Sequence, residues 1–184
     1  MKNFKILSLV VGMLTVITVM AGCGSSSPAP LDLFAAASSG QEPQLNSIVS
    51  GTFNTTSFTG FSANNAYWLF TGGFSAASGN YLAPADGIVS DVETATVNGI
   101  SGSSVTIIHS GDLATRVYGI QLVNVQIKEP VLKGSPIGTY ITTGQVAFQV
   151  LFNGIPVCPL SYVSSSFRSV LASSFASSFS QLCQ

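Results

Sequence analysis

Alternation of apolar and polar residues is the feature that most constrains how this chain folds. In residues 145–152 one side of an extended strand would carry Val146, Phe148, Val150 and Phe152, and the other would carry Gln145, Ala147, Gln149 and Leu151. Residues 123–128 alternate strictly as well. A period of two residues is typical of a half-buried β-strand and does not fit a helix. The middle of the chain is therefore predicted to be mainly β.

Turn-forming residues divide the region from 51 to 160 into further strands. Residues 104–109 and 114–120 are rich in β-forming residues, and Ser110-Gly111-Asp112 between them predicts a hairpin. Further turns are predicted at 133–136 and at Asn153-Gly154. The stretch 83–87 predicts a tight turn into a strand, with a positive φ at Gly87.

The C-terminal segment 163–184 has a helical period instead. Its apolar residues follow one another mostly at steps of three or four: Phe167, Val170, Leu171, Phe175, Phe179 and Leu182. We expect a helix of about four turns packed on the sheet, because its many serines make it weak without tertiary contacts. A membrane-surface or partner-binding helix is the alternative, but Arg168 is the only basic residue there.

Residues 1–22 are typical of a bacterial secretory signal with a lipoprotein-type cleavage site. Two lysines precede an apolar run, and Met20-Ala21-Gly22 places small residues directly before Cys23. We expect cleavage before Cys23, acylation there (palmitate included) and a flexible tether over 23–30. An ordinary signal peptide or an uncut membrane helix is the alternative, although the run is short for a span. Gly24 favours the outer membrane of a two-membraned cell, because an inner-membrane retention signal would place aspartate there.

The expected mature chain carries few charges. Without Lys2 and Lys5 it has four basic and seven acidic side chains, a net charge of about −3. With no basic cluster, nucleic-acid binding is excluded. About 160 residues suffice for one domain with its own core.

Cys158 and Cys183 are the cysteines left after Cys23 is acylated. Export would place them in an oxidising compartment, where they allow one disulfide. Two free buried thiols are the alternative. A zinc site that combines them with a histidine has no supporting spacing.

Five segments between about 67 and 162 resemble, in order, parts of the LytM-type (M23-family) peptidase domain. They are 83–89, 105–111, 115–118, 131–138 and 144–160. The resemblance implies a small barrel-like β-sandwich (a duplicated hybrid motif) at 67–162, after an extension over 31–66. Members of the family cut peptide cross-links in peptidoglycan with a zinc ion.

The residues that hold zinc in the family are not found in this sequence. The resemblance places the family's first histidine and its aspartate near Leu69 and Gly73, and the second histidine of its His-x-His strand at Ala147. A further catalytic histidine falls on Ile120. None of these side chains can ligate zinc through a nitrogen, sulfur or carboxylate oxygen. We therefore expect no metal, no cofactor and no catalytic residues.

The resemblance then implies a catalytically inactive, membrane-anchored domain that binds or regulates in cell-wall remodelling. Degenerate family members regulate wall hydrolases by binding an amidase, so the expected partners are the lipid membrane and either peptidoglycan or a wall hydrolase. The matching positions around the former site are candidates for a binding groove: Arg116, Tyr118, Gln145 and Gln149. The alternative is that they are ordinary polar residues of the surface.

Other functions stay open on the sequence alone. The chain could be a structural envelope lipoprotein that holds peptidoglycan without regulating anything. A zinc peptidase with unorthodox ligands such as Asp86, Asp91 or Cys158 is less favoured. His109, the one histidine, fits a turn residue better than the base of a serine triad. Lys133 lies in the wrong turn for a biotinyl or lipoyl carrier.

Overall fold

The computed structural model describes residues 44–50, 57–62, 64, 66–71, 78–97, 99–141, 145–175 and 182–184. The expected signal peptide, Cys23 and the tether lie outside these residues, as does much of the 31–66 extension. Among the described residues, no helix combines the length and the apolar character needed to cross a membrane.

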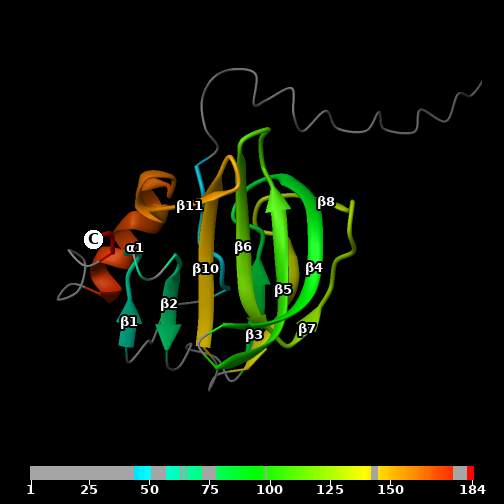
Figure 1. The fold of residues 1–184 in the computed structure, drawn as a ribbon, viewed down its shortest axis with the longest axis horizontal. Coiled ribbons are helices and arrows are strands. Elements are labelled where there is room, and N and C mark those ends of the chain that lie inside the picture. Colours follow the sequence, from blue (N-terminus) through cyan, green and yellow to red (C-terminus); the bar gives the residue numbers. More distant parts are fainter. Residues whose placement is uncertain are drawn as a thin grey trace, which may run out of the picture. The chain divides into compact units, whose positions relative to one another are not determined.

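The described residues form two antiparallel sheets, so the fold is mainly β as the sequence predicts (Figure 1). The larger sheet has the order β1 (Ser57–Thr59), β2 (Trp68–Thr71), β10 (Gln145–Phe152), β6 (Leu113–Ile120), β5 (Ile100–Ile108), β4 (Gly87–Val97) and β8 (Pro130–Val131), with β11 (Ile155–Val157) paired to β10. The smaller sheet has the order β3 (Ser78–Leu82), β9 (Pro136–Ile141) and β7 (Leu122–Val123). A 3₁₀ turn, η2 (Pro159–Ser161), leads into α1 (Ser165–Ser174).

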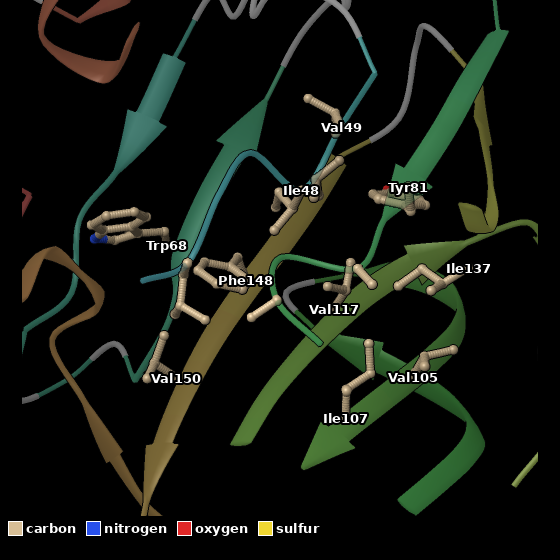
Figure 2. Close-up of a cluster of buried hydrophobic side chains, with 14 of the residues drawn as sticks. Ile48, Val49, Trp68, Tyr81, Val105, Ile107, Val117, Ile137, Phe148 and Val150 are labelled. Carbon is tan, nitrogen blue, oxygen red and sulfur yellow. The ribbon is translucent and has the colours of Figure 1, made fainter. Parts of the chain in front are cut away.

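The core lies between the two sheets. Val117 and Phe148 of the larger sheet are fully buried with Ile137 of the smaller sheet, and Ile48 of the N-terminal segment joins them (Figure 2). Burying one such side chain contributes roughly 1.5–3 kcal/mol to the free energy of unfolding. The alternation in β10 is confirmed, because its Val146, Phe148 and Val150 belong to this core and its Ala147 packs in a separate cluster.

The strand predicted over 123–128 is wrong beyond Val123. Strand β7 pairs with β9 only at Leu122 and Val123. Lys128 then has a φ of 73° and donates its backbone N–H to Val89 O, 2.7 Å away. The chain leaves the smaller sheet here to reach β8 at the edge of the larger one, so no partner strand is left for the alternating residues.

The predicted hairpin and turns are confirmed. Strands β5 and β6 pair antiparallel around the turn at Ser110–Asp112, and Gly134, Asn153 and Gly154 have positive φ. Gly87 differs from the expectation, because it is not among the positive-φ residues. It is required by close approach instead: a Cβ there would lie 2.5 Å from Ile108 O.

The C-terminal helix is shorter than expected. Ser164 caps α1, with its side chain accepting from the Phe167 N–H (3.2 Å), and the helix ends at Ser174. Residues 182–184 are not helical: Leu182 O accepts from the Phe61 N–H, and the Gln184 N–H donates to Phe61 O. These bonds take the C-terminus alongside residue 61, so the apolar period does not continue as one helix to Leu182.

A disulfide between Cys158 and Cys183 joins the C-terminus to the end of β11, with the two Cα atoms 5.8 Å apart. Trp68 is fully buried beneath this segment and donates its indole N–H to Leu182 O (2.8 Å). Phe58 and Phe70 pack with Phe175, which follows α1. The helix and the C-terminus therefore cover the β1–β2 end of the larger sheet.

Candidate functional site

The larger sheet has a second face, opposite the core, which we call the outer face. It is made by residues that are neighbours across β2, β10, β6 and β5: Leu69, Ala147, Gln149, Tyr118, Arg116 and Thr106. Strand alternation puts these side chains on the side away from Phe148 and Val117. All four groove candidates from the sequence lie on this face by strand alternation. Three of them (Arg116, Tyr118 and Gln149) contact one another.

The positions that the resemblance assigns to zinc ligands come together on the outer face. Leu69 and Ala147 are register partners of β2 and β10, and Ala147 is also the partner of Tyr118 on β6. The three side chains form a small hydrophobic cluster in which Ala147 is completely buried. Hydrocarbon thus fills the place where the family resemblance puts two metal donors. Gly73 lies outside the described residues.

A chain of hydrogen bonds runs beside this cluster. Arg116 donates Nε–H to Thr106 Oγ1 (2.7 Å) and an Nη1–H to the Tyr118 hydroxyl (3.4 Å). That hydroxyl donates to Gln149 Oε1 (3.3 Å), and Gln149 Nε2 donates to Ala66 O (3.1 Å). Tyr118 and Gln149 are buried. These bonds satisfy their polar groups inside the protein.

Arg116 is the member of this chain that reaches solvent. Its side chain is 29% exposed and lies 3.9 Å from a carboxylate oxygen of Glu93. Burial opposes its charge, but the Tyr118 hydroxyl and the carboxylates of Glu93 and Asp91 raise the pKa of the guanidinium. Gln145, the fourth candidate, lies opposite Thr71 at the start of β10 and is half-buried.

A hollow of about 420 Å³ opens on the outer face, on the side of Arg116 that is away from Tyr118. Thr106, the hydrogen-bond partner of Arg116, forms one wall; the β5–β6 turn at Ser110–Asp112 and the β10–β11 turn at Asn153–Gly154 form others. The Asn153 N–H donates to Asp112 O (2.8 Å), which holds the two turns together. The sequence marks these residues only as turns, so it does not reveal that they share a wall.

His109 is a buried structural residue. Its Nδ1 lies 2.8 Å from Asp86 O, and because a carbonyl only accepts, Nδ1 carries the proton. Nε2 then accepts from the Thr115 hydroxyl, also 2.8 Å away. Burial lowers the pKa of the imidazole to about 4, and the contact with Asp86 offsets only part of this. His109 and Thr115 are both closed to solvent, so a substrate has no access to the pair.

Ile120, at the family's further catalytic position, does not face the outer face. Gly119 has a φ of 86°, and the β5–β6 register shifts beside it. Ile120 consequently belongs to the core while Tyr118 stays on the outer face. The bulge therefore turns the Ile120 side chain away from the outer face on which Tyr118 lies.

The alternative zinc ligands suggested by the sequence do not form a metal site, and two of them already have other partners. Cys158 is in the disulfide, and Asp86 Oδ1 accepts from the Lys133 N–H (2.7 Å). Over the part of the chain that the structure describes, no three His, Cys, Asp or Glu side chains are grouped closely enough to hold a metal ion.

Comparison with known proteins gives a fold. No protein-family model matches the chain. No curated protein matches it either. Among solved structures, Helicobacter pylori Csd3 in an orthorhombic crystal is similar over 67% of this chain and 36% of that chain, with a TM-score of 0.54 and 18% identity. The hexagonal crystal gives a TM-score of 0.51 at 19% identity, over 67% of this chain and 34% of that one.

The catalytic domain of the prophage-encoded M23 protein EnpA from Enterococcus faecalis is also similar, with a TM-score of 0.48 and 19% identity over 67% of this chain and 98% of that chain. The chain spans only about a third of the length of Csd3. At these identities the likeness is one of fold, and that fold is the LytM-like β domain of M23 peptidase structures.

Proposed function

We propose that this chain is a lipid-anchored LytM-like domain that works without a metal, as a binding and regulatory protein in cell-wall remodelling. The observation that carries the proposal is the packing of Leu69 against Ala147 and Tyr118 on the outer face. A catalytic zinc site needs three protein ligands and an open position for water. The buried side chains of Leu69 and Ala147 offer neither a ligand atom nor an open position for water. This supports a role in binding rather than in peptide cleavage.

The neighbouring surface supports this role with groups suited to a polar partner. Arg116 presents a partly exposed guanidinium beside the hollow, and Asp112 and Asn153 line that hollow. The bonds to Thr106 and Tyr118 fix the guanidinium in one orientation, so a partner would lose little entropy in ordering it. A wall amidase docked on this face is the partner we propose.

The proposed docking is tested by adding the purified full chain to a cell-wall amidase and following dye release from labelled peptidoglycan. We expect faster release with the chain than without it, and no release by the chain alone. Arg116→Gln should lose the stimulation. Arg168→Gln, which removes an arginine from α1 instead, is the matched control and should keep it.

Two results would contradict the proposal. Dye release by the chain alone would make it a hydrolase. Binding of peptidoglycan with no effect on any co-resident amidase would make it a structural envelope protein.

The anchor is tested separately by Cys23→Ser. We expect the variant to lack lipid and to leave the membrane fraction, because the acyl chains supply the membrane affinity. A variant that still sediments with membranes would assign anchoring to an uncut signal segment or to another part of the chain.

A further inference from the structure

One long edge of the larger sheet has no neighbouring strand in the described part of the chain. Strand β4 pairs with β5 along its whole length, from Ile88 to Val97. On the other side of β4, β8 pairs only with Gly87 and Ile88. Of the residues that the structure describes, Val89 is the last on this side with backbone hydrogen bonds, which it makes with Lys128 and Glu129. Beyond the bulge at Ser90, residues 91–97 form the last strand of the sheet, and we call this stretch the β4 edge.

The β4 edge lacks lysine and proline, two of the features with which proteins block pairing with another strand. Natural edges are also protected by other charged side chains, by bulges or by being very short; along residues 91–97 the only charged side chains are the carboxylates of Asp91 and Glu93. Residues 91–97 read Asp-Val-Glu-Thr-Ala-Thr-Val, without lysine or proline and with several β-branched residues. A bulge is present at Ser90, but it lies where β8 ends, before the open part of the edge.

The side chains along the edge define what could pair with it. Asp91 and Glu93 are on the outer face, together with Ala95 and Val97. Val92 packs against the core side, and Thr94 and Thr96 are exposed. Arg116 balances one of the two carboxylates, at 3.9 Å from Glu93, so the edge keeps a net negative charge on its outer face.

We infer that the β4 edge is a docking site for an extended, basic segment of a partner protein, which adds to the sheet as a further strand. Backbone hydrogen bonds to the edge would supply affinity. On the outer face, alternate residues of the added strand would lie beside Asp91 and Glu93, which favours lysine or arginine there. The intervening residues would lie beside Val92 and Thr94, which favours β-branched side chains. This site shares the Arg116–Glu93 ion pair with the proposed amidase-docking face, but it rests on the open backbone of the β4 edge and does not depend on that proposal.

The test uses a fluorescent seven-residue peptide in which lysine alternates with valine, and the full chain of the protein. We expect saturable binding by fluorescence anisotropy. The same peptide with glutamate in place of lysine should bind at least about tenfold more weakly, because opposite-charge cross-strand pairs become like-charge pairs. A scrambled peptide with the same lysines and valines should also bind weakly. Equal binding of the alternating and scrambled peptides would mean simple charge attraction and would overturn the inference.

N-methylation of the peptide tests the strand pairing itself without any risk to the protein's fold. In an extended strand, alternate backbone N–H groups point to opposite edges. Methylating the nitrogens of the valines and, in a second peptide, those of the lysines should abolish binding in one peptide and leave it in the other. Binding that survives in both peptides, or is lost from both, contradicts addition of a strand.

Charge reversal in the protein gives the matching control. Glu93→Lys should weaken binding of the lysine peptide at least about tenfold, since it turns one opposite-charge cross-strand pair into a like-charge pair. Ser173→Lys/Ser174→Lys, at two exposed positions of α1, changes the net charge equally and should leave binding near that of the unchanged chain. If the chain instead forms dimers that Glu93→Lys disrupts, and no peptide binds, the occupant is a second copy and the inference is wrong.

Discussion

Leu69 and Ala147 are the residues on which the functional account depends. They are directly opposed on β2 and β10, and directly opposed residues of antiparallel strands have Cβ atoms about 4.5–5.5 Å apart. That separation suits two histidines that share a metal ion. The side chains present are hydrocarbon and carry no donor atom for a metal ion.

Restoring donors at these two positions should create a metal site. We expect Leu69→His/Ala147→His to bind about one Ni²⁺ or Zn²⁺ per chain, and each single variant to bind far more weakly, because two imidazoles are needed to compete with water. Isothermal titration calorimetry gives the stoichiometry, and circular dichroism checks that the overpacked variant is folded. A folded double variant without metal affinity would mean that Leu69 and Ala147 do not face each other.

His109 is a second residue whose environment has a measurable consequence. Its pKa is lowered to about 4 by burial, from 6.5 in the unfolded chain. Between these values the unfolded state binds the proton and the folded state does not, so the free energy of unfolding falls as pH drops from 6.5 to 4. The loss from this group is about 3 kcal/mol and is complete below pH 4.

NMR can follow this titration directly, because the chain has a single histidine. We expect the imidazole signals of His109 to show the neutral Nδ1–H tautomer at pH 6 and to titrate only near pH 4. In urea unfolding, His109→Gln should be less stable than the unchanged chain at neutral pH but lose less stability on acidification. A titration midpoint near 6.5 would mean that the imidazole is exposed.

At the scale of elements, α1 and the C-terminus are held to the β1–β2 end by packing and by one covalent bond. Phe175 packs on Phe58 and Phe70, and the Cys158–Cys183 disulfide closes a loop with a sequence separation of 25 residues. Trp68 lies beneath the C-terminal segment and is bonded to Leu182 O. Release of the C-terminus would therefore expose the indole.

Cys183→Ser should lower the free energy of unfolding by roughly 3 kcal/mol, the entropy of closing a loop of this length in the unfolded chain. Fluorescence of Trp68, the one tryptophan, should shift to the red as water reaches the ring. Ser173→Ala, at an exposed position of α1, is the control and should change neither quantity. Unchanged stability and fluorescence in Cys183→Ser would show that packing alone holds the segment.

Elements whose sequence signal is local were predictable, and those that depend on distant partners were not. The alternation in β10 reports two faces that really differ, and Asn153-Gly154 adopts the positive φ that its turn requires. Residues 123–128 alternate as regularly as β10 does, yet only Val123 of these residues pairs with β9. The helical spacing of apolar residues gives no sign that Leu182 forms a backbone hydrogen bond with Phe61 instead of extending α1.

The candidate site shows the same division. The resemblance suggested Arg116, Tyr118 and Gln149 as groove residues; the structure brings them into one chain of hydrogen bonds, but none of the three lines the hollow. The hollow beside them was not predictable, because its walls come from two turns that meet only through the order of β10, β6 and β5 in the sheet.

At the scale of the whole molecule, the described residues form a LytM-like sandwich in which one face of the larger sheet makes the core and the other makes a surface. The fold likeness to Csd3 concerns this β domain. We propose that the outer face recognises a partner through Arg116 and the adjacent hollow, without a metal ion. Metal would then contribute nothing to stability, so a chelator should leave the melting temperature unchanged.

The zinc content of the purified full chain tests the central claim most directly. After incubation with excess zinc and gel filtration, mass spectrometry of the metal should find far less than one zinc per chain, because Leu69 and Ala147 have no donor atoms to retain it. Retention of about one zinc per chain, removed only by a strong chelator, would contradict this and would support a zinc peptidase instead.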